Sequence, residues 1–282
     1  MGFSQDMKAT GQTDYKRPLA TELGDVVTTP STGMLAAMAS ASLGDDLAIR
    51  TLLTQPPCRV LVDSRAHVAA HFEEGGLGMS GVSIQTVRPS NARYLVLEDI
   101  VSRILVTNDV HKGPTRVISI ENTAGGSVVP LAELRRIREW AGRSRVVVHM
   151  DGARLWEAVA AGRGGLRDYC TLCDLASLDF SRNLGAPMRA MVLGSAQLIA
   201  RLRRIRKSIG GALRQSGPVA AAAQFAFMEQ FGLGPWESRG KLRAVHLLAK
   251  QVETNLVWVD LDKADITLGL LFEEALKLRP NL

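Results

Sequence analysis

The sequence predicts an α/β fold with three layers, in which a mainly parallel β-sheet has helices on both of its faces. Short apolar runs rich in β-branched residues alternate along the chain with longer amphipathic segments, as they do in repeated strand–helix–strand units. One such run, 146–151, ends in the carboxylate of Asp151, which is typical of the sheet edge where ligands bind. The chain has 282 residues, of which 46% are hydrophobic. That is enough for one large domain with a small one beside it.

Six segments have the apolar, β-branched composition of buried strands. They are 59–63, 82–87, 116–122, 146–151, 174–179 and 188–193. Helices are predicted between them, over 34–43, 66–74, 97–105, from Pro130 onward, over 155–161 and from a cap at Ser195. Glycines are expected to end two of these helices, with Gly44 after the first and Gly75 after the second.

The helix that begins after Ser195 has an apolar face and a basic one. Its basic face carries Arg201, Arg203, Arg204, Arg206 and Lys207. Aromatic residues are not interleaved with these cations, as a single-strand nucleic-acid binder requires, so a solvated face is favoured and no nucleic-acid partner is expected. The net charge of +6 suits an anionic small ligand equally well.

Composition narrows the cellular setting. The three cysteines, Cys58, Cys170 and Cys173, are too few for a disulfide framework, and the CxxC spacing lacks the second pair that a structural zinc needs. Buried thiols beside a strand are expected instead. The chain has neither a long apolar span nor the apolar core of a signal peptide, so a cytoplasmic protein without a membrane segment is expected. Residues 1–24 are predicted to be a disordered lead-in.

Two groups of residues could carry chemistry. Asp151 and Arg154 lie three residues apart at a predicted strand end, where they can face one anionic, nitrogen-bearing ligand, or Asp151 can cap the next helix. His67 and His71 are spaced to share a metal, but no third ligand is evident, so no metal is expected. His67 also lies just after a strand end, where its ring can stack on a planar cofactor.

Several motifs, spread over most of the chain in one order, together resemble the low-specificity L-threonine aldolases. These are pyridoxal-phosphate (PLP) enzymes of the aspartate-aminotransferase fold type. The matching segments are 24–31, 63–67, Glu121-Asn122-Thr123 with Gly125-Gly126, 149–154, Arg206-Lys207 with 210–215, and 252–255. Matched motifs in order are far more specific than any one of them. The resemblance implies a PLP-transferase-like large domain over 25–250 and the start of a truncated small domain over 251–282.

The resemblance also implies roles for particular residues. Asp151 would hold the proton on the ring nitrogen of PLP, which makes the ring an electron sink. Arg154 would contact the phenolic side of the cofactor or the substrate carboxylate. His67 would stack on the ring and take the β-hydroxyl proton, so that retro-aldol cleavage of threonine or another β-hydroxy-α-amino acid gives glycine and an aldehyde. Lys207 and Arg214 would reach a neighbouring subunit's site, which implies a homo-oligomer, either a dimer or a tetramer.

The sequence departs from the family at the Schiff-base lysine. The family motif Ser-Lys-Gly-Leu-Gly-Ala-Pro is here Ser181-Arg182-Asn183-Leu184-Gly185-Ala186-Pro187, so Arg182 takes the lysine position. No lysine occurs between Lys112 and Lys207. A guanidinium stays protonated and has no free lone pair to attack an aldehyde.

A second departure comes directly after Gly44-Asp45-Asp46. The family has a long helix and a Ser-Gly-Thr phosphate loop there, whereas this chain continues directly with 47–50, which resembles the family segment on the far side of that loop. In addition, Gly24 stands at a family serine and Arg189 at a family glycine. Two classes of function remain: a PLP-dependent lyase or an amino-acid racemase-like relative, and a non-catalytic descendant that associates with an intact paralogue.

Overall fold

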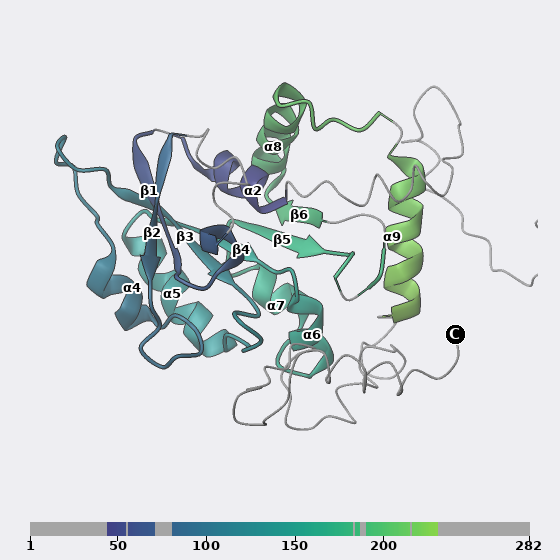
Figure 1. Ribbon diagram of the computed structural model, residues 1–282, viewed down its shortest axis with the longest axis horizontal. Coiled ribbons are helices and arrows are strands. Elements are labelled where there is room, and N and C mark those ends of the chain that lie inside the picture. The colour runs from purple at the N-terminus through teal and green to yellow at the C-terminus, as the bar shows by residue number, and fades with distance from the viewer. Residues whose placement is uncertain are drawn as a thin grey trace, which may run out of the picture.

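A six-stranded sheet forms the centre of the molecule in the computed structural model (Figure 1). The structure describes residues 44–54, 56–70, 81–182, 184–186, 190–214 and 216–230. The strands are β1 (Cys58–Asp63), β2 (Val82–Val87), β3 (Thr115–Glu121), β4 (Val147–Asp151), β5 (Leu175–Asp179) and β6 (Ala190–Gly194). Their order is β2-β1-β3-β4-β5-β6, with every neighbouring pair parallel except β5 and β6.

Helices cover both faces of this sheet (Figure 1). One face packs against α2 (Gly44–Leu52) and α8 (Ala196–Ser208), and the two helices also contact each other. On the other face lie α4 (Leu97–Arg103), α5 (Leu131–Arg143), α6 (Leu155–Ala160) and α7 (Leu166–Cys170). The short α3 (His67–Ala70) comes after β1, and α9 (Gly217–Gln230) ends the described chain. The fold class predicted from the sequence is confirmed.

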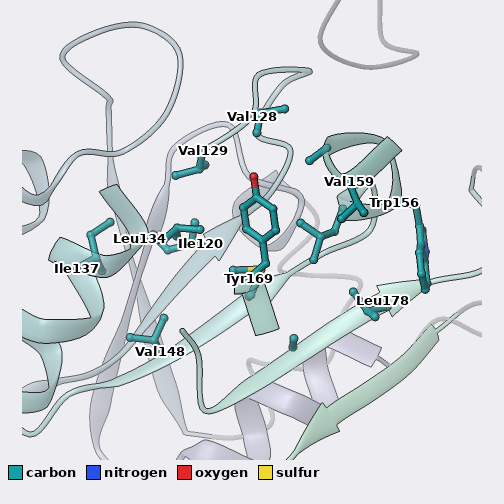
Figure 2. Close-up of a cluster of buried hydrophobic side chains, with 14 of the residues drawn as sticks. Ile120, Val128, Val129, Leu134, Ile137, Val148, Trp156, Val159, Tyr169 and Leu178 are labelled. Atoms are coloured by element: carbon teal, nitrogen blue, oxygen red, sulfur yellow. The ribbon is translucent and has the colours of Figure 1, made fainter. Parts of the chain in front are cut away.

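The α5–α7 face holds the larger apolar cluster (Figure 2). Trp156, at 1% exposure, makes edge-to-face contacts with Phe180 and Phe227 at centroid distances of 5.5 and 5.7 Å. Its indole N–H donates to the Asp179 carbonyl at 2.6 Å, so its polar atom is satisfied within the core. Leu134 and Ile137 project from α5 toward the same cluster. This face is sealed by large, close-packed side chains.

The α2–α8 face is smaller and more polar near the ends of the strands. Its apolar residues come mainly from α2, β1 and α8, among them Ile49, Val60 and Leu202. Toward the carboxyl end of the sheet, β3, β4 and β5 replace apolar residues with Ser119, His149 and Ser177, all buried. These hydrogen-bonding groups mark where packing gives way to a site.

Most sequence-predicted elements agree with the structure, but one interpretation was wrong. Gly44 was expected to end a helix, whereas it begins α2, because its missing side chain lets the helix start lie directly against the sheet. The pattern also gave no indication of α7 or α9. The predicted helix 34–43, the lead-in 1–24 and the segment 251–282 lie outside the described residues.

No helix among the described residues is long and apolar enough to cross a membrane. The thiol of Cys58 is buried, and those of Cys170 and Cys173 are half-buried next to β5. Burial raises the pKa of Cys170 to about 11 and that of Cys173 to about 12. At neutral pH both are neutral thiols, in line with the structural role expected for them.

Candidate active site

Acidic residues gather where the parallel strands end. Asp63, Glu121, Asp151 and Asp179 are the last residues of β1, β3, β4 and β5. Because these strands run in one direction, their carboxyl ends meet at one edge of the sheet, which is the usual ligand-binding edge of such folds. In the β3–β4 register, Glu121 lies directly opposite Asp151. The two acids are therefore neighbours by construction of the sheet.

Asp151 is held in place by the turn that comes after it. Its side chain is buried, and its Oδ1 accepts a hydrogen bond from the Ala153 N–H at 3.0 Å. Gly152 lies so close to β5 that an added Cβ would come within 2.7 Å of the Ser177 carbonyl. Asp151 thus caps its own turn, while Arg154, the N-cap of α6, forms no side-chain cap. The turn contact is close to the capping role considered for Asp151, and its contact with a ligand stays a prediction.

The site holds its carboxyls in a poorly solvated place. Burial raises the pKa of Asp151, while the Ala153 N–H and the nearby Arg182 and Arg154 lower it. Burial, with Asp151 alongside, raises the pKa of Glu121 to about 8. Two interacting acids of this kind titrate as a pair, and near neutral pH the pair retains a proton.

His67 reaches the acids through the main chain. It is half-buried as the first residue of α3, and its backbone N–H donates to Glu121 Oε2 at 2.8 Å. The turn before it is fixed by Arg65, whose guanidinium donates to both carboxylate oxygens of Asp63 and to the carbonyl of Ala92. The structure therefore brings His67 to the same edge as Glu121, while its stacking on a cofactor ring stays a prediction.

Arg182 lies three residues beyond the end of β5. Its Nε approaches Asp179 Oδ2 at 3.4 Å, and its positive charge acts on Asp151. Arg154 is half-buried and acts on both Asp151 and Glu121. Of the residues expected at the site, His67, Asp151, Arg154 and Arg182 are thus assembled at one edge.

Lys207 and Arg214 do not belong to the strand ends that carry the acids. Lys207 is exposed in the last turn of α8, and Arg214 is exposed in the segment between α8 and α9. Their approach to a neighbouring subunit's site stays a prediction. His71, the possible metal partner of His67, lies outside the described residues, among which no group of three or more metal-ligating side chains is found.

Sequence reasoning missed a buried polar group beside these acids. His149 Nδ1 lies 2.9 Å from Ser119 Oγ, and its Nε2 lies 3.2 Å from Ser177 Oγ and 3.6 Å from Asp45 Oδ1. Burial lowers the pKa of His149 to about 3, so its ring is neutral. The sequence did contain a signal for this group. In each of three adjacent strands, a polar residue lies two positions before the terminal acid, so both side chains point to the same face of the sheet. Asp45 gave none, because Gly44 was interpreted as a helix end.

Comparison with known proteins shows the family to which this chain belongs. The sequence profile of the family described as beta-eliminating lyase matches residues 46–265. This chain belongs to that β-eliminating lyase family. It is 44% identical to the alanine racemase TOXG of Cochliobolus carbonum, over 86% of this chain and 75% of that protein. It is 35% identical to the low specificity L-threonine aldolase of Saccharomyces cerevisiae, over 86% of this chain and 65% of that protein.

Solved structures give the same fold. A Leishmania major threonine aldolase superposes with a TM-score of 0.58 at 20% identity, covering 69% of this chain and 60% of that one. The β-eliminating lyase family and its threonine aldolase neighbours are PLP-dependent. The alignment with TOXG runs over 293 positions, more than the 282 residues of this chain, so TOXG has residues with no counterpart here.

The candidate site of this chain fits only part of PLP. Asp151, buried at the strand end beside Glu121, has the chemistry to hold a proton on a pyridine nitrogen. Arg182 does not fit the aldehyde, because a guanidinium offers no lone pair for a covalent bond. The residues present therefore do not fit a covalently held cofactor.

Proposed function

We propose that this chain is a threonine-aldolase-like protein that does not carry out the covalent step of its family and acts as a non-catalytic member. The observation that carries the proposal is Arg182 at the end of β5, where its Nε lies 3.4 Å from Asp179 Oδ2. In the resemblance, this position belongs to the lysine that forms the Schiff base. Family membership is independent of the proposal, since it rests on the profile match.

Neither described lysine replaces the missing one. Lys112 lies on the loop before β3, where its Nζ pairs with Asp109 at 3.4 Å. Lys207 is exposed in the last turn of α8 and does not belong to the strand ends that carry the acids. Loss of a covalent catalytic group lowers a rate by several orders of magnitude. We therefore expect no measurable retro-aldol cleavage of threonine by this chain alone.

The proposed role is association with a catalytically complete relative, or with a second copy of this chain. The described residues form the sheet and both helical layers, so a folded body is available for association. Lys207 and Arg214 are exposed, so both can take the role that the resemblance implies for them at a neighbouring subunit's site. Such a subunit contributes cations to a partner site while its own site is silent.

A second candidate function is amino-acid racemisation with PLP bound without a covalent link. It is favoured by 44% identity to the alanine racemase TOXG, above the identity to the yeast threonine aldolase. Asp151, beside Glu121 at the strand ends, also favours it. This candidate requires a general base at the site, for which His67 is the available group.

One experiment separates the two. Purified protein is mixed with PLP, reduced with borohydride and mapped by peptide mass, while glycine release from threonine and D-alanine formation from L-alanine are measured. Yeast low specificity L-threonine aldolase serves as the positive control, and Arg182→Lys as the matched variant. We expect no adduct within residues 175–194 of the wild-type chain, no glycine and no D-alanine.

Glycine release at the rate of the yeast enzyme would sink the non-catalytic proposal. D-alanine formation without an adduct would establish the racemase candidate instead. Association is tested by mass photometry of the chain alone and mixed with a complete family member. If this chain is monomeric both alone and in the mixture, the proposed role is contradicted.

A further inference from the structure

The first turn of α2 lies over the acid cluster at the carboxyl edge of the sheet. Asp45, its second residue, places Oδ1 3.6 Å from His149 Nε2, and its carboxyl is hydrogen-bonded to Ser177. The Oδ1 atom itself is buried and has no hydrogen-bond partner among the described residues. Asp45 therefore projects from the helix start into the space between β4 and β5.

The backbone of α2 leaves no gap beneath this turn. A Cβ added to Gly44 would come within 2.6 Å of Ala190 Cβ and 3.9 Å of Ser177 Cβ, so the helix start rests directly on β5 and β6. The helix also contacts β4 and α8, and Figure 1 shows it beside α8 on one side of the sheet. An extra group cannot enter between Gly44 and the strands without moving the helix.

A helix start at this edge is where an anion would ordinarily bind. The first backbone N–H groups of a helix have no partner within it, and the helix dipole adds a partial positive charge. The nine residues of α2 run from the carboxyl edge, at Asp45, toward the start of β1. Two acidic side chains, Asp45 and Asp46, fill its first turn. The positive end of the helix is thus already supplied with carboxyls from its own chain.

The surroundings oppose a further negative charge. Burial, Asp151, Asp179 and Asp46 all raise the pKa of Asp45, while the hydrogen bond from Ser177 lowers it. Burial raises the pKa of Asp46 to about 6, so this group is ionised at neutral pH. His149 gives no compensating charge, because its ring is neutral. Among the residues that the structure describes, the charged groups that act on Asp45 are all acids, so an incoming dianion would be repelled at the helix start.

From this arrangement we propose that Asp45 and Asp46 are an internal occupant of the site, which keeps phosphate-bearing ligands away from the start of α2. The inference deepens the proposed function, but it concerns anion binding and does not depend on the residue at position 182. It makes Asp45 the determinant that sets which ligands this edge accepts: neutral or cationic ligands rather than phosphate esters.

The first test measures anion binding without any cofactor chemistry. Thermal unfolding of the wild-type chain, Asp45→Ala and Asp46→Asn is followed against sulfate, with chloride at equal ionic strength as the reference. Asp109→Ala, in an exposed loop, is the matched control. We expect sulfate to bind the control no better than it binds wild type. Asp45→Ala and Asp46→Asn should each bind sulfate up to about tenfold tighter than wild type, the size of one favourable interaction at a helix start. Saturable sulfate binding by wild type, equal to that of Asp45→Ala, overturns the proposal.

The second test compares PLP with pyridoxal, which lacks the phosphate. In an Arg182→Lys background, the new amine can condense with either aldehyde, with loss of water, and the visible absorbance of the imine reports occupancy. We expect pyridoxal to bind at least as well as PLP to Arg182→Lys. With Asp45→Ala added, PLP binding should tighten about tenfold while pyridoxal binding changes less than about twofold.

A preference of Arg182→Lys for PLP over pyridoxal, unchanged by Asp45→Ala, contradicts the inference. That result would leave the proposed function standing, because it concerns the phosphate and not the lysine. Conversely, an adduct within residues 175–194 of the wild-type chain would sink the proposed function and leave the anion result intact. If Asp45→Ala does not fold, the wild-type chain is tested alone by thermal unfolding with each ligand. A larger rise in the unfolding temperature with PLP than with pyridoxal would overturn the inference.

Discussion

The two faces of the sheet differ in what they bury, although the same strands form both. The α5–α7 face is closed by large apolar side chains, with Trp156 and Tyr169 fully buried among them (Figure 2). The α2–α8 face is apolar at the start of the strands and polar at their ends, where Ser119, His149 and Ser177 are buried. One face stabilises the fold, whereas the other gives up part of that stability to hold buried polar groups.

The difference explains how the fold can persist when residues at the site are substituted. Burial of large side chains contributes most of the favourable free energy of folding, and it does not depend on the identity of residues at the site. Position 182 and the start of α2 both border the polar end of the α2–α8 face. Substitutions there leave the contacts of the apolar core in place.

Truncating the largest side chain of the α5–α7 face should have the largest effect. Trp156→Ala removes two ring contacts and the hydrogen bond to the Asp179 carbonyl. We expect the free energy of unfolding to fall by about 3–5 kcal/mol, measured by urea denaturation. Val110→Ala, at a position 91% exposed, is the control and should change it by less than about 0.5 kcal/mol. A loss near the control value would show that this face is not the main source of stability.

The acid cluster should make the second face lose stability as pH rises. The pKa of Glu121 is raised to about 8 in the folded state, so between about pH 4.5 and 8 the unfolded chain releases a proton that the folded chain keeps. Stability from this group is therefore full below pH 4.5 and lost as pH rises. Asp45 and Asp46 act in the same direction.

Glu121→Gln should remove part of this slope. We expect the variant to be more stable than wild type at pH 8 by on the order of 2 kcal/mol, and not at pH 4.5. His149, held neutral, works in the opposite direction below pH 6.5 in both proteins, so the difference between them is the quantity to compare. Parallel pH profiles of urea unfolding for the two proteins would refute the assignment.

A single hydrogen bond of the buried polar group should have a smaller effect. Ser119→Ala removes the partner of His149 Nδ1 at 2.9 Å and leaves a buried ring nitrogen unsatisfied. We expect a loss of about 1–2 kcal/mol by urea denaturation. Ser102→Ala is the control, because its hydroxyl makes an exposed bond within α4. Equal losses in the two variants would mean that the buried hydrogen bond stabilises the fold no more than an exposed one.

The smallest effect is expected outside both faces. Arg136 pairs with Glu98 and Glu133 on the surface of α5, and its side chain is 47% exposed. Arg136→Ala should cost less than about 1 kcal/mol, and less still at high salt, because solvent screens exposed pairs. Thermal unfolding at low and high salt checks this, and a loss as large as that of Trp156→Ala would contradict the ranking.

The sequence was most informative where local composition and tertiary environment agree. The strand 82–87 has the ends that its composition predicts, and the Asp151 turn is recognisable from a buried strand that ends in Asp-Gly. Glu121 can be placed by the same logic, because two adjacent parallel strands each end in an acid. The helix α9 was missed, since its alanine-rich sequence has no apolar periodicity.

Asp45 shows why part of the site could not be predicted. Glycine ends helices more often than it starts them, so Gly44 was interpreted as a terminus. Only the close approach of Gly44 to Ala190 shows why a glycine begins this helix. A contact between residues so far apart in the chain leaves no local trace in the sequence.

The hydrogen bond from the Trp156 indole to the Asp179 carbonyl has a consequence for engineering and for evolution. It fastens the end of β5 to the α5–α7 face, three residues before Arg182. The backbone that leads to residue 182 is therefore held by a hydrogen bond from the apolar core on the opposite face of the sheet. A side chain substituted at position 182 would keep this attachment, because the bond is made by the main chain of Asp179 and not by residue 182.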